Sequence, residues 1–175
     1  MLCIDIPPAE YFDEADETFV TLKGGTLKLE HSLRSVSKWE SKWHKSFLNT
    51  DEKSNEEWLD YVRCMTINKV EDQNIYNGLT VENVQKINEY ISDPMTATVI
   101  HERRGKRRSR KVVTSEVIYS WMVDMGIPFE CENWHLARLM TLIRVCDENG
   151  TPKKKMSKKD IFAQNAALNA ARKKH

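Results

Sequence analysis

The sequence predicts an α+β fold that is mostly helical. Three observations lead to this prediction: alternating apolar residues around a glycine pair near the start, later stretches with apolar residues at helical spacing, and the composition. The chain has 175 residues, of which 40% are hydrophobic and 30% are charged. This composition argues against a wholly disordered chain and against a membrane protein, and the length suits one domain with its own core.

The start of the chain favours β structure. Residues 2–6 form a strand candidate, which we expect to stop at the two prolines that follow. Residues 18–22 and 26–29 flank a glycine pair at 24–25. Alternating apolar residues on both sides of such a pair are typical of a hairpin, so we expect an N-terminal β-hairpin region with its turn at these glycines.

About five core helices should follow, because apolar residues recur at spacings of three and four. The expected helices cover about residues 33–48, 55–67, 81–92, 116–125 and 132–145. The N-cap candidates are Ser32, Ser54, Thr80 and either Thr114 or Ser115. In the third helix, one apolar side is expected to contain Val81, Val84, Ile87 and Ile91.

Aromatic residues follow the same helical spacing. Trp39, Trp43 and Phe47 share one expected helix face, which favours core packing over a partner-binding stripe. We expect the other tryptophans to pack in the core as well: Trp58, Trp121 and Trp134.

A run of basic residues lies between two further strand candidates, residues 96–100 and 112–114, which predicts a second, basic hairpin. The basic loop contains Arg103, Arg104, Lys106, Arg107, Arg108, Arg110 and Lys111. Together with a basic group at residues 153–174, this loop holds 15 of the 27 Lys and Arg residues, which leaves the rest of the chain acidic. Such a loop can neutralise the phosphates of nucleic acid or contact an acidic protein surface, and both roles stay open.

The C-terminal residues 151–175 are expected to be separate from a helical domain formed by residues 1–150. They comprise a basic linker and a weakly packed, alanine-rich helix with few large apolar residues. The apolar face of this expected helix is too small to pack as part of a core, which suits docking on a partner. The candidate partner-binding residues are Ile161, Phe162, Ala166 and Leu168.

No residue pattern predicts a catalytic site, a cofactor or a metal site. The chain lacks a nucleophile elbow, a phosphate-binding glycine loop and a metalloprotease motif. Cys131 and His135 are four residues apart, but a closed zinc site needs further ligands. Those ligands would have to come from elsewhere, from Cys64, Cys146 and His44. We therefore expect no metal, and reduced cysteines packed as small apolar groups.

Five stretches resemble a family of short proteins encoded by long-tailed bacteriophages and prophages of Gram-positive gut bacteria. The stretches are residues 26–43, 61–67, 87–98, 127–146 and 156–174. Members of this family are usually described as tail assembly chaperones or left uncharacterised. The resemblance implies a non-enzymatic protein that keeps the tape measure protein, a long helical rod, soluble until the tail tube forms around it. The basic loop is more charged than in other members, so a shared role for it does not follow.

This resemblance implies a location in the host cell cytoplasm, and absence from the mature virion. We expect no membrane partner, because no apolar run is long enough to span a bilayer. Two other functions stay open: a phage nucleic-acid-binding or regulatory protein that uses the basic loop and tail, and a structural tail or connector subunit. Self-association between the acidic body and the basic segments also stays open.

Overall fold

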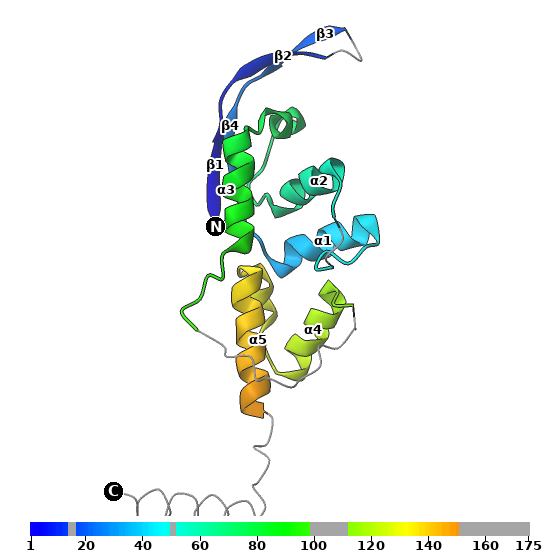
Figure 1. Ribbon diagram of the computed structural model, residues 1–175, viewed down its shortest axis with the longest axis vertical. Coiled ribbons are helices and arrows are strands. Elements are labelled where there is room, and N and C mark those ends of the chain that lie inside the picture. Colours follow the sequence, from blue (N-terminus) through cyan, green and yellow to red (C-terminus); the bar gives the residue numbers. More distant parts are fainter. Residues whose placement is uncertain (14–16, 50–51, 99–111, 151–175) are drawn as a thin grey trace, which may run out of the picture. The chain divides into compact units, whose positions relative to one another are not determined.

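The computed structural model describes residues 1–13, 17–49, 52–98 and 112–150 (Figure 1). Its strands are β1 (Leu2–Ile6), β2 (Ala9–Asp13), β3 (Thr18–Leu22) and β4 (Gly25–Leu29). Its helices are α1 (Leu33–Trp43), α2 (Asn55–Met65), α3 (Val81–Ser92), α4 (Ser115–Asp124) and α5 (Leu136–Gly150), with the 3₁₀ helices η1 (Gln73–Gly78) and η2 (Phe129–Asn133). The predicted α+β, mostly helical fold is confirmed.

The chain divides into two compact units, Met1–Arg144 and Val145–His175. The ribbon, the two pockets and the buried polar cluster described below belong to the first unit. The predicted boundary after residue 150 stays a prediction, because residues 151–175 lie outside the described part.

The strands form a long antiparallel ribbon whose pairing differs from the prediction. β1 pairs with β4 and β2 pairs with β3. The register runs to Ile6 opposite Gly25 and resumes with Ala9 opposite Leu22, and Figure 1 shows β2–β3 following on from β1–β4 after a bend. The predicted hairpin turn at the glycine pair is therefore wrong, because β3 and β4 are successive parts of one side of the ribbon.

The prolines interrupt the ribbon without ending it. Proline lacks a backbone N–H, so the ladder cannot continue through Pro7 and Pro8. The opposite side passes close to them at Gly24, whose φ is +70° and whose Cβ, if present, would lie 2.7 Å from the Ile6 carbonyl oxygen and the Pro8 nitrogen. Glycine at this position therefore serves a close approach of two backbones rather than a turn.

Helices α1, α2 and α3 begin where the sequence predicts. The side chains of Ser32, Ser54 and Thr80 each accept a hydrogen bond from the backbone N–H three residues later, as N-caps do. Helix α1 ends earlier than predicted, because His44 takes a left-handed conformation with φ 53°. Helix α5 begins later than predicted, since η2 occupies the preceding residues.

The predicted strands of the second hairpin are not formed in the described residues 96–98 and 112–114. Hydrogen bonds to side chains use these backbone groups instead. The Thr98 N–H donates to the Thr96 hydroxyl oxygen at 3.1 Å, and the Val113 carbonyl accepts from the Ser46 hydroxyl at 2.7 Å. The basic loop itself lies outside the described residues.

Buried side chains of β1, β4 and the helices form the core. Its largest fully buried side chains include Leu27, Leu29, Leu33, Trp39, Tyr61, Met65, Ile87, Ile118, Met122 and Leu139. Trp39 and Phe47 are buried as predicted. Trp134 is 36% exposed, so its predicted core position is wrong, because it lies in the extended connection between η2 and α5.

Candidate partner-binding site

Helix α3 presents its two valines to solvent, contrary to the prediction. Val81 is 86% exposed and Val84 is half-buried, whereas Asn83, Ile87 and Tyr90 form the buried side. Two polar contacts set this rotation of the helix. The Tyr90 hydroxyl donates to a Glu30 carboxylate oxygen at 2.6 Å, and the Asn83 side-chain amide donates to the Asp5 carbonyl at 3.5 Å.

The outward side of α3 lines an open groove of about 450 Å³. The groove is lined by Val81, Val84, Gln85, Asn88, Glu89 and Ser92, which recur at helical spacing on one face. Trp58 of α2 lies beside it, because its indole N–H donates to the Asn88 side-chain oxygen at 3.1 Å.

The polar residues of this groove already have partners. Gln85 donates to Glu89 at 3.0 Å, and the Ser92 hydroxyl donates to the Asn88 carbonyl at 2.8 Å. Covering the two valines with another protein would therefore contribute more binding free energy than covering the polar residues of the groove. An open groove with an apolar floor suits an amphipathic helix of a partner.

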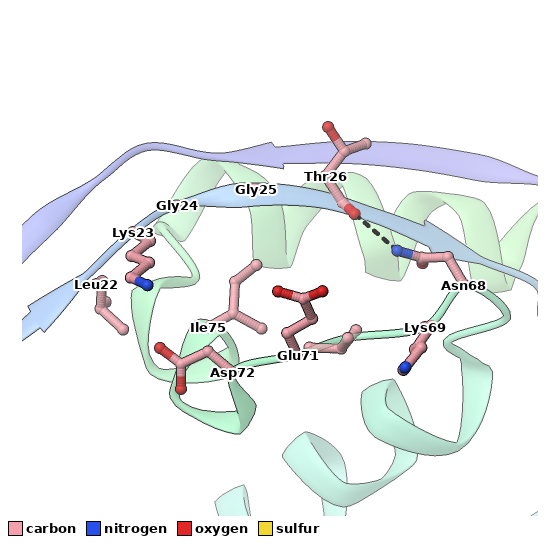
Figure 2. Close-up of a pocket in the computed structure, with 11 residues that line it drawn as sticks. Leu22, Lys23, Gly24, Gly25, Thr26, Asn68, Lys69, Glu71, Asp72 and Ile75 are labelled. Atoms are coloured by element: carbon pink, nitrogen blue, oxygen red, sulfur yellow. Dashed lines mark hydrogen bonds between the residues drawn. The ribbon is translucent and has the colours of Figure 1, made fainter.

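A second, smaller pocket lies beside the β3–β4 junction (Figure 2). It has a volume of about 260 Å³, below the roughly 300–1,000 Å³ of small-molecule sites. Figure 2 shows Asn68 against β4, where its side-chain amide donates to the Thr26 carbonyl at 3.0 Å, and the charged groups of Lys69, Glu71 and Asp72 around the opening. The lining holds no His, Cys or Ser, so it offers no paired nucleophile and base of that kind.

A buried polar cluster links α2 and α3 to the connections that precede α1 and α5. The His31 Nδ1 lies 2.5 Å from the Tyr61 hydroxyl, and the His31 and His135 rings lie 5.0 Å apart. The His135 Nε2 lies 3.0 Å from the Tyr90 carbonyl oxygen. Burial, with a smaller contribution from His135, lowers the pKa of His31 to about 3, and burial raises the pKa of Tyr61. The cluster is therefore uncharged at neutral pH on its His31–Tyr61 side, which suits a structural role.

The candidate metal ligands do not come together in the described part of the chain. Cys131 is buried in η2 and His135 packs against His31, whereas His44 is exposed at the end of α1. Within residues 1–13, 17–49, 52–98 and 112–150, no three His, Cys, Asp or Glu side chains are placed to hold a metal ion.

The other predicted site residues lie outside the described residues. They are the basic-loop residues Arg103, Arg104, Lys106, Arg107, Arg108, Arg110 and Lys111, and the C-terminal residues Ile161, Phe162, Ala166 and Leu168. Their roles therefore stay predictions.

Sequence reasoning missed the α3 groove because two apolar sets overlap on this helix. Val81 with Val84, and Ile87 with Ile91, both fit a period of 3.6 residues. Only the long-range contacts of Asn83 and Tyr90 decide which set turns inward. A polar residue with a tertiary partner was the missing signal.

No family model matches the chain, and neither the curated proteins nor the solved structures contain a match. In the part that the structure describes, no helix has both the length and the apolar character needed to cross a bilayer.

Proposed function

We propose that this protein is a non-enzymatic tail assembly chaperone of a long-tailed bacteriophage, which binds the tape measure protein during tail morphogenesis. The observation that carries the proposal is the open groove of α3, with Val81 86% exposed at its end. A helical rod with an exposed apolar stripe is the kind of partner that such a groove fits. The resemblance of five stretches of the sequence to tail assembly chaperones supports the same partner.

The size of the groove fits a partner that must later be released. Fully burying one valine side chain contributes about 1.5–3 kcal/mol, and part of this is offset by the cost of association. Two valines alone therefore give weak binding at one site. Several copies along one rod would add their contributions, and tail-tube subunits could displace them one at a time.

The C-terminal residues provide a second proposed contact. Ile161, Phe162, Ala166 and Leu168 form the apolar part of an otherwise basic and alanine-rich segment. Deletion of residues 151–175 should weaken binding of the tape measure protein. If the deletion variant keeps the tape measure protein as soluble as the full chain does, the C-terminal residues are not needed for the contact, and α3 remains as the proposed contact.

The proposal is tested by co-expression with the tape measure protein encoded beside it, followed by affinity purification and size-exclusion chromatography. We expect a soluble complex with several copies of this chain on each rod. An insoluble tape measure protein beside a free chain of 20.4 kDa would contradict the proposal.

The concentration of 15 of 27 basic residues in two segments favours one alternative, a phage nucleic-acid-binding protein. Binding of DNA at two salt concentrations separates the two functions, because contacts to phosphates give a steep dependence on salt. Tight, salt-sensitive binding would favour the alternative. A structural tail or connector subunit, by contrast, would remain in purified virions, from which a chaperone is absent.

A further inference from the structure

A group of cations lies on α1 and α2, which pack side by side (Figure 1). Lys42 donates to the Asp60 carboxylate at 2.5 Å, and Lys45 donates to the Glu57 carboxylate at 2.5 Å. Both carboxylates are buried, whereas the two lysine side chains are 60% and 63% exposed. The ion pairs therefore hold the lysines at the surface, above the acids that they contact.

Two further cations extend this group. Lys38 is exposed on α1, one helical turn before Lys42. Arg63 of α2 is also exposed, and it lies 4.0 Å from the Asp60 carboxylate oxygen that Lys42 contacts. We call these four cations the basic face: Lys38, Lys42, Lys45 and Arg63. They outnumber the two carboxylates beneath them, so the basic face carries a net positive charge.

Charge of the opposite sign gathers on α4 and η2. Residues 112–137 contain no Lys or Arg, and their acids are Glu116, Asp124, Glu130 and Glu132. The same surface holds an aromatic pair. The Tyr119 hydroxyl donates to the Glu132 carboxylate at 2.6 Å, and the Tyr119 ring lies 6.2 Å from the Phe129 ring. Phe129 is 56% exposed, so an apolar ring is accessible within an acidic segment.

Three of these acids lie around the aromatic pair. Glu116 precedes Tyr119 by three residues, which places both on one side of α4. Glu130 follows Phe129 directly in the sequence, and Glu132 is bound to Tyr119. Glu116 and Glu130 are exposed, and Glu132 is half-buried. We call these three acids, together with Phe129, the acidic face.

The two faces do not neutralise each other within one copy. Lys42, Lys45 and Arg63 contact acids of α2, and among the described residues no ion pair joins the basic face to the acidic face. We infer that the basic face of one copy binds the acidic face of a second copy. The charges of the two faces are complementary, and the exposed ring of Phe129 suits the alkyl stems and cationic groups of lysine and arginine side chains.

The two contacting surfaces are different, so the contact is heterologous and leaves one basic face and one acidic face free at the ends of each pair. Association can therefore continue from copy to copy. Exposed ion pairs are individually weak, so the degree of association should depend strongly on protein concentration. The inference concerns self-assembly of the chain and does not depend on a tape measure partner or on the α3 groove.

The first measurement is sedimentation velocity on the full chain, over a concentration series at about 0.05 and about 0.5 M NaCl. Surface charges are screened at high salt, so we expect the mass to rise with concentration at low salt and the apparent Kd to weaken about tenfold or more at high salt. A constant mass of 20.4 kDa at every concentration and both salts would overturn the inference.

Charge-reversal variants locate the two faces. The acidic-face variant combines Glu116→Lys with Glu130→Lys, and the basic-face variant combines Lys38→Glu with Arg63→Glu. Lys42 stays unchanged, as does Lys45, because each pairs with a buried carboxylate. Each variant alone should remain at 20.4 kDa at low salt. A face variant that associates like the wild type would contradict the inference.

Matched controls reverse the same number of charges at exposed positions elsewhere. They combine Glu71→Lys with Glu82→Lys, and Lys69→Glu with Lys86→Glu. Glu82 is a close match for Glu116, because both lie in the first turn of a helix. Both controls should associate like the wild type. Equal losses in the face variants and their controls would show that net charge, rather than these two faces, governs association.

Mixing the two face variants keeps the test decisive if one of them is suspected of misfolding. Each variant retains one intact face, because the acidic-face variant keeps the basic face and the basic-face variant keeps the acidic face. The mixture should therefore show masses above 20.4 kDa at concentrations where each variant alone does not. A mixture without a complex, in which both variants keep the circular dichroism of the wild type, would overturn the inference.

Discussion

Glu40 shows how one buried side chain joins two distant segments. Its carboxylate accepts the Phe47 N–H at 2.8 Å and the Ser115 N–H at 2.7 Å, and the side chain is buried. Ser115 is the first residue of α4, whose N-cap Thr114 makes no side-chain capping bond. Glu40 therefore supplies from α1 the acceptor that a local cap usually provides.

Replacing Glu40 with Ala should leave these two backbone donors unpaired in the interior. We expect the free energy of unfolding to fall by about 2–6 kcal/mol, since each of the two buried unpaired groups costs about 1–3 kcal/mol. Urea unfolding measures this change. The exposed Glu130→Ala is the control and should stay within about 0.5 kcal/mol of the wild type, so equal effects would contradict this role of Glu40.

His31 should make the stability of the protein depend on pH. Its folded-state pKa of about 3 lies below the ordinary 6.5, so the unfolded chain binds a proton in this window that the folded chain does not. Stability from a neutral His31 is then complete above pH 6.5 and decreases as the pH falls towards 3. The slope has an upper limit of about 1.4 kcal/mol per pH unit.

The comparison with His31→Gln isolates this contribution. Urea unfolding between pH 4 and 8 should show the wild type losing stability faster than the variant on the acid side. The difference in unfolding free energy between the two should therefore shrink as the pH falls. Parallel pH dependences would mean that His31 is not held neutral in the fold.

Among elements, those specified by local sequence were predictable and those specified by distant contacts were not. The starts of α1, α2 and α3 follow from Ser32, Ser54 and Thr80, because a capping side chain acts over three residues. The pairing of the ribbon depends instead on how Gly24 meets Pro7 and Pro8. A glycine pair has the same sequence pattern in a turn and at a close approach of strands.

Two glycines with positive φ test whether Gly24 is needed for a close approach of two backbones or only for its backbone conformation. Gly126 has φ +65° and no atom near its missing Cβ, so Gly126→Ala should cost only the conformational term of about 1–2 kcal/mol. Gly24→Ala should destabilise the protein further, because its Cβ would lie 2.7 Å from two backbone atoms. Thermal unfolding of both variants measures the difference, and equal losses would show that the ribbon relaxes around Gly24.

Across the whole molecule, the sequence predicted the fold class but not the candidate site. The fold class was predicted from the composition and from the spacing of apolar residues, which are both averaged over many residues. An error in one segment therefore does not change the predicted fold class. The α3 groove depends on one rotation of one helix, which the Tyr90–Glu30 contact selects. The buried His31–Tyr61 pair also depends on a tertiary contact, because the two residues lie 30 positions apart in the sequence. The sequence therefore did not predict it.

The most direct test of the central claim compares Val81→Asp with Val123→Asp in binding the tape measure protein. Both valines are largely exposed on helices, at 86% and 61%, but only Val81 lies in the α3 groove. We expect Val81→Asp to weaken the complex about tenfold or more, because a charge replaces the apolar end of the groove, and Val123→Asp to bind like the wild type. Equal binding by both variants, with their folds intact by circular dichroism, would contradict α3 as the partner-binding site.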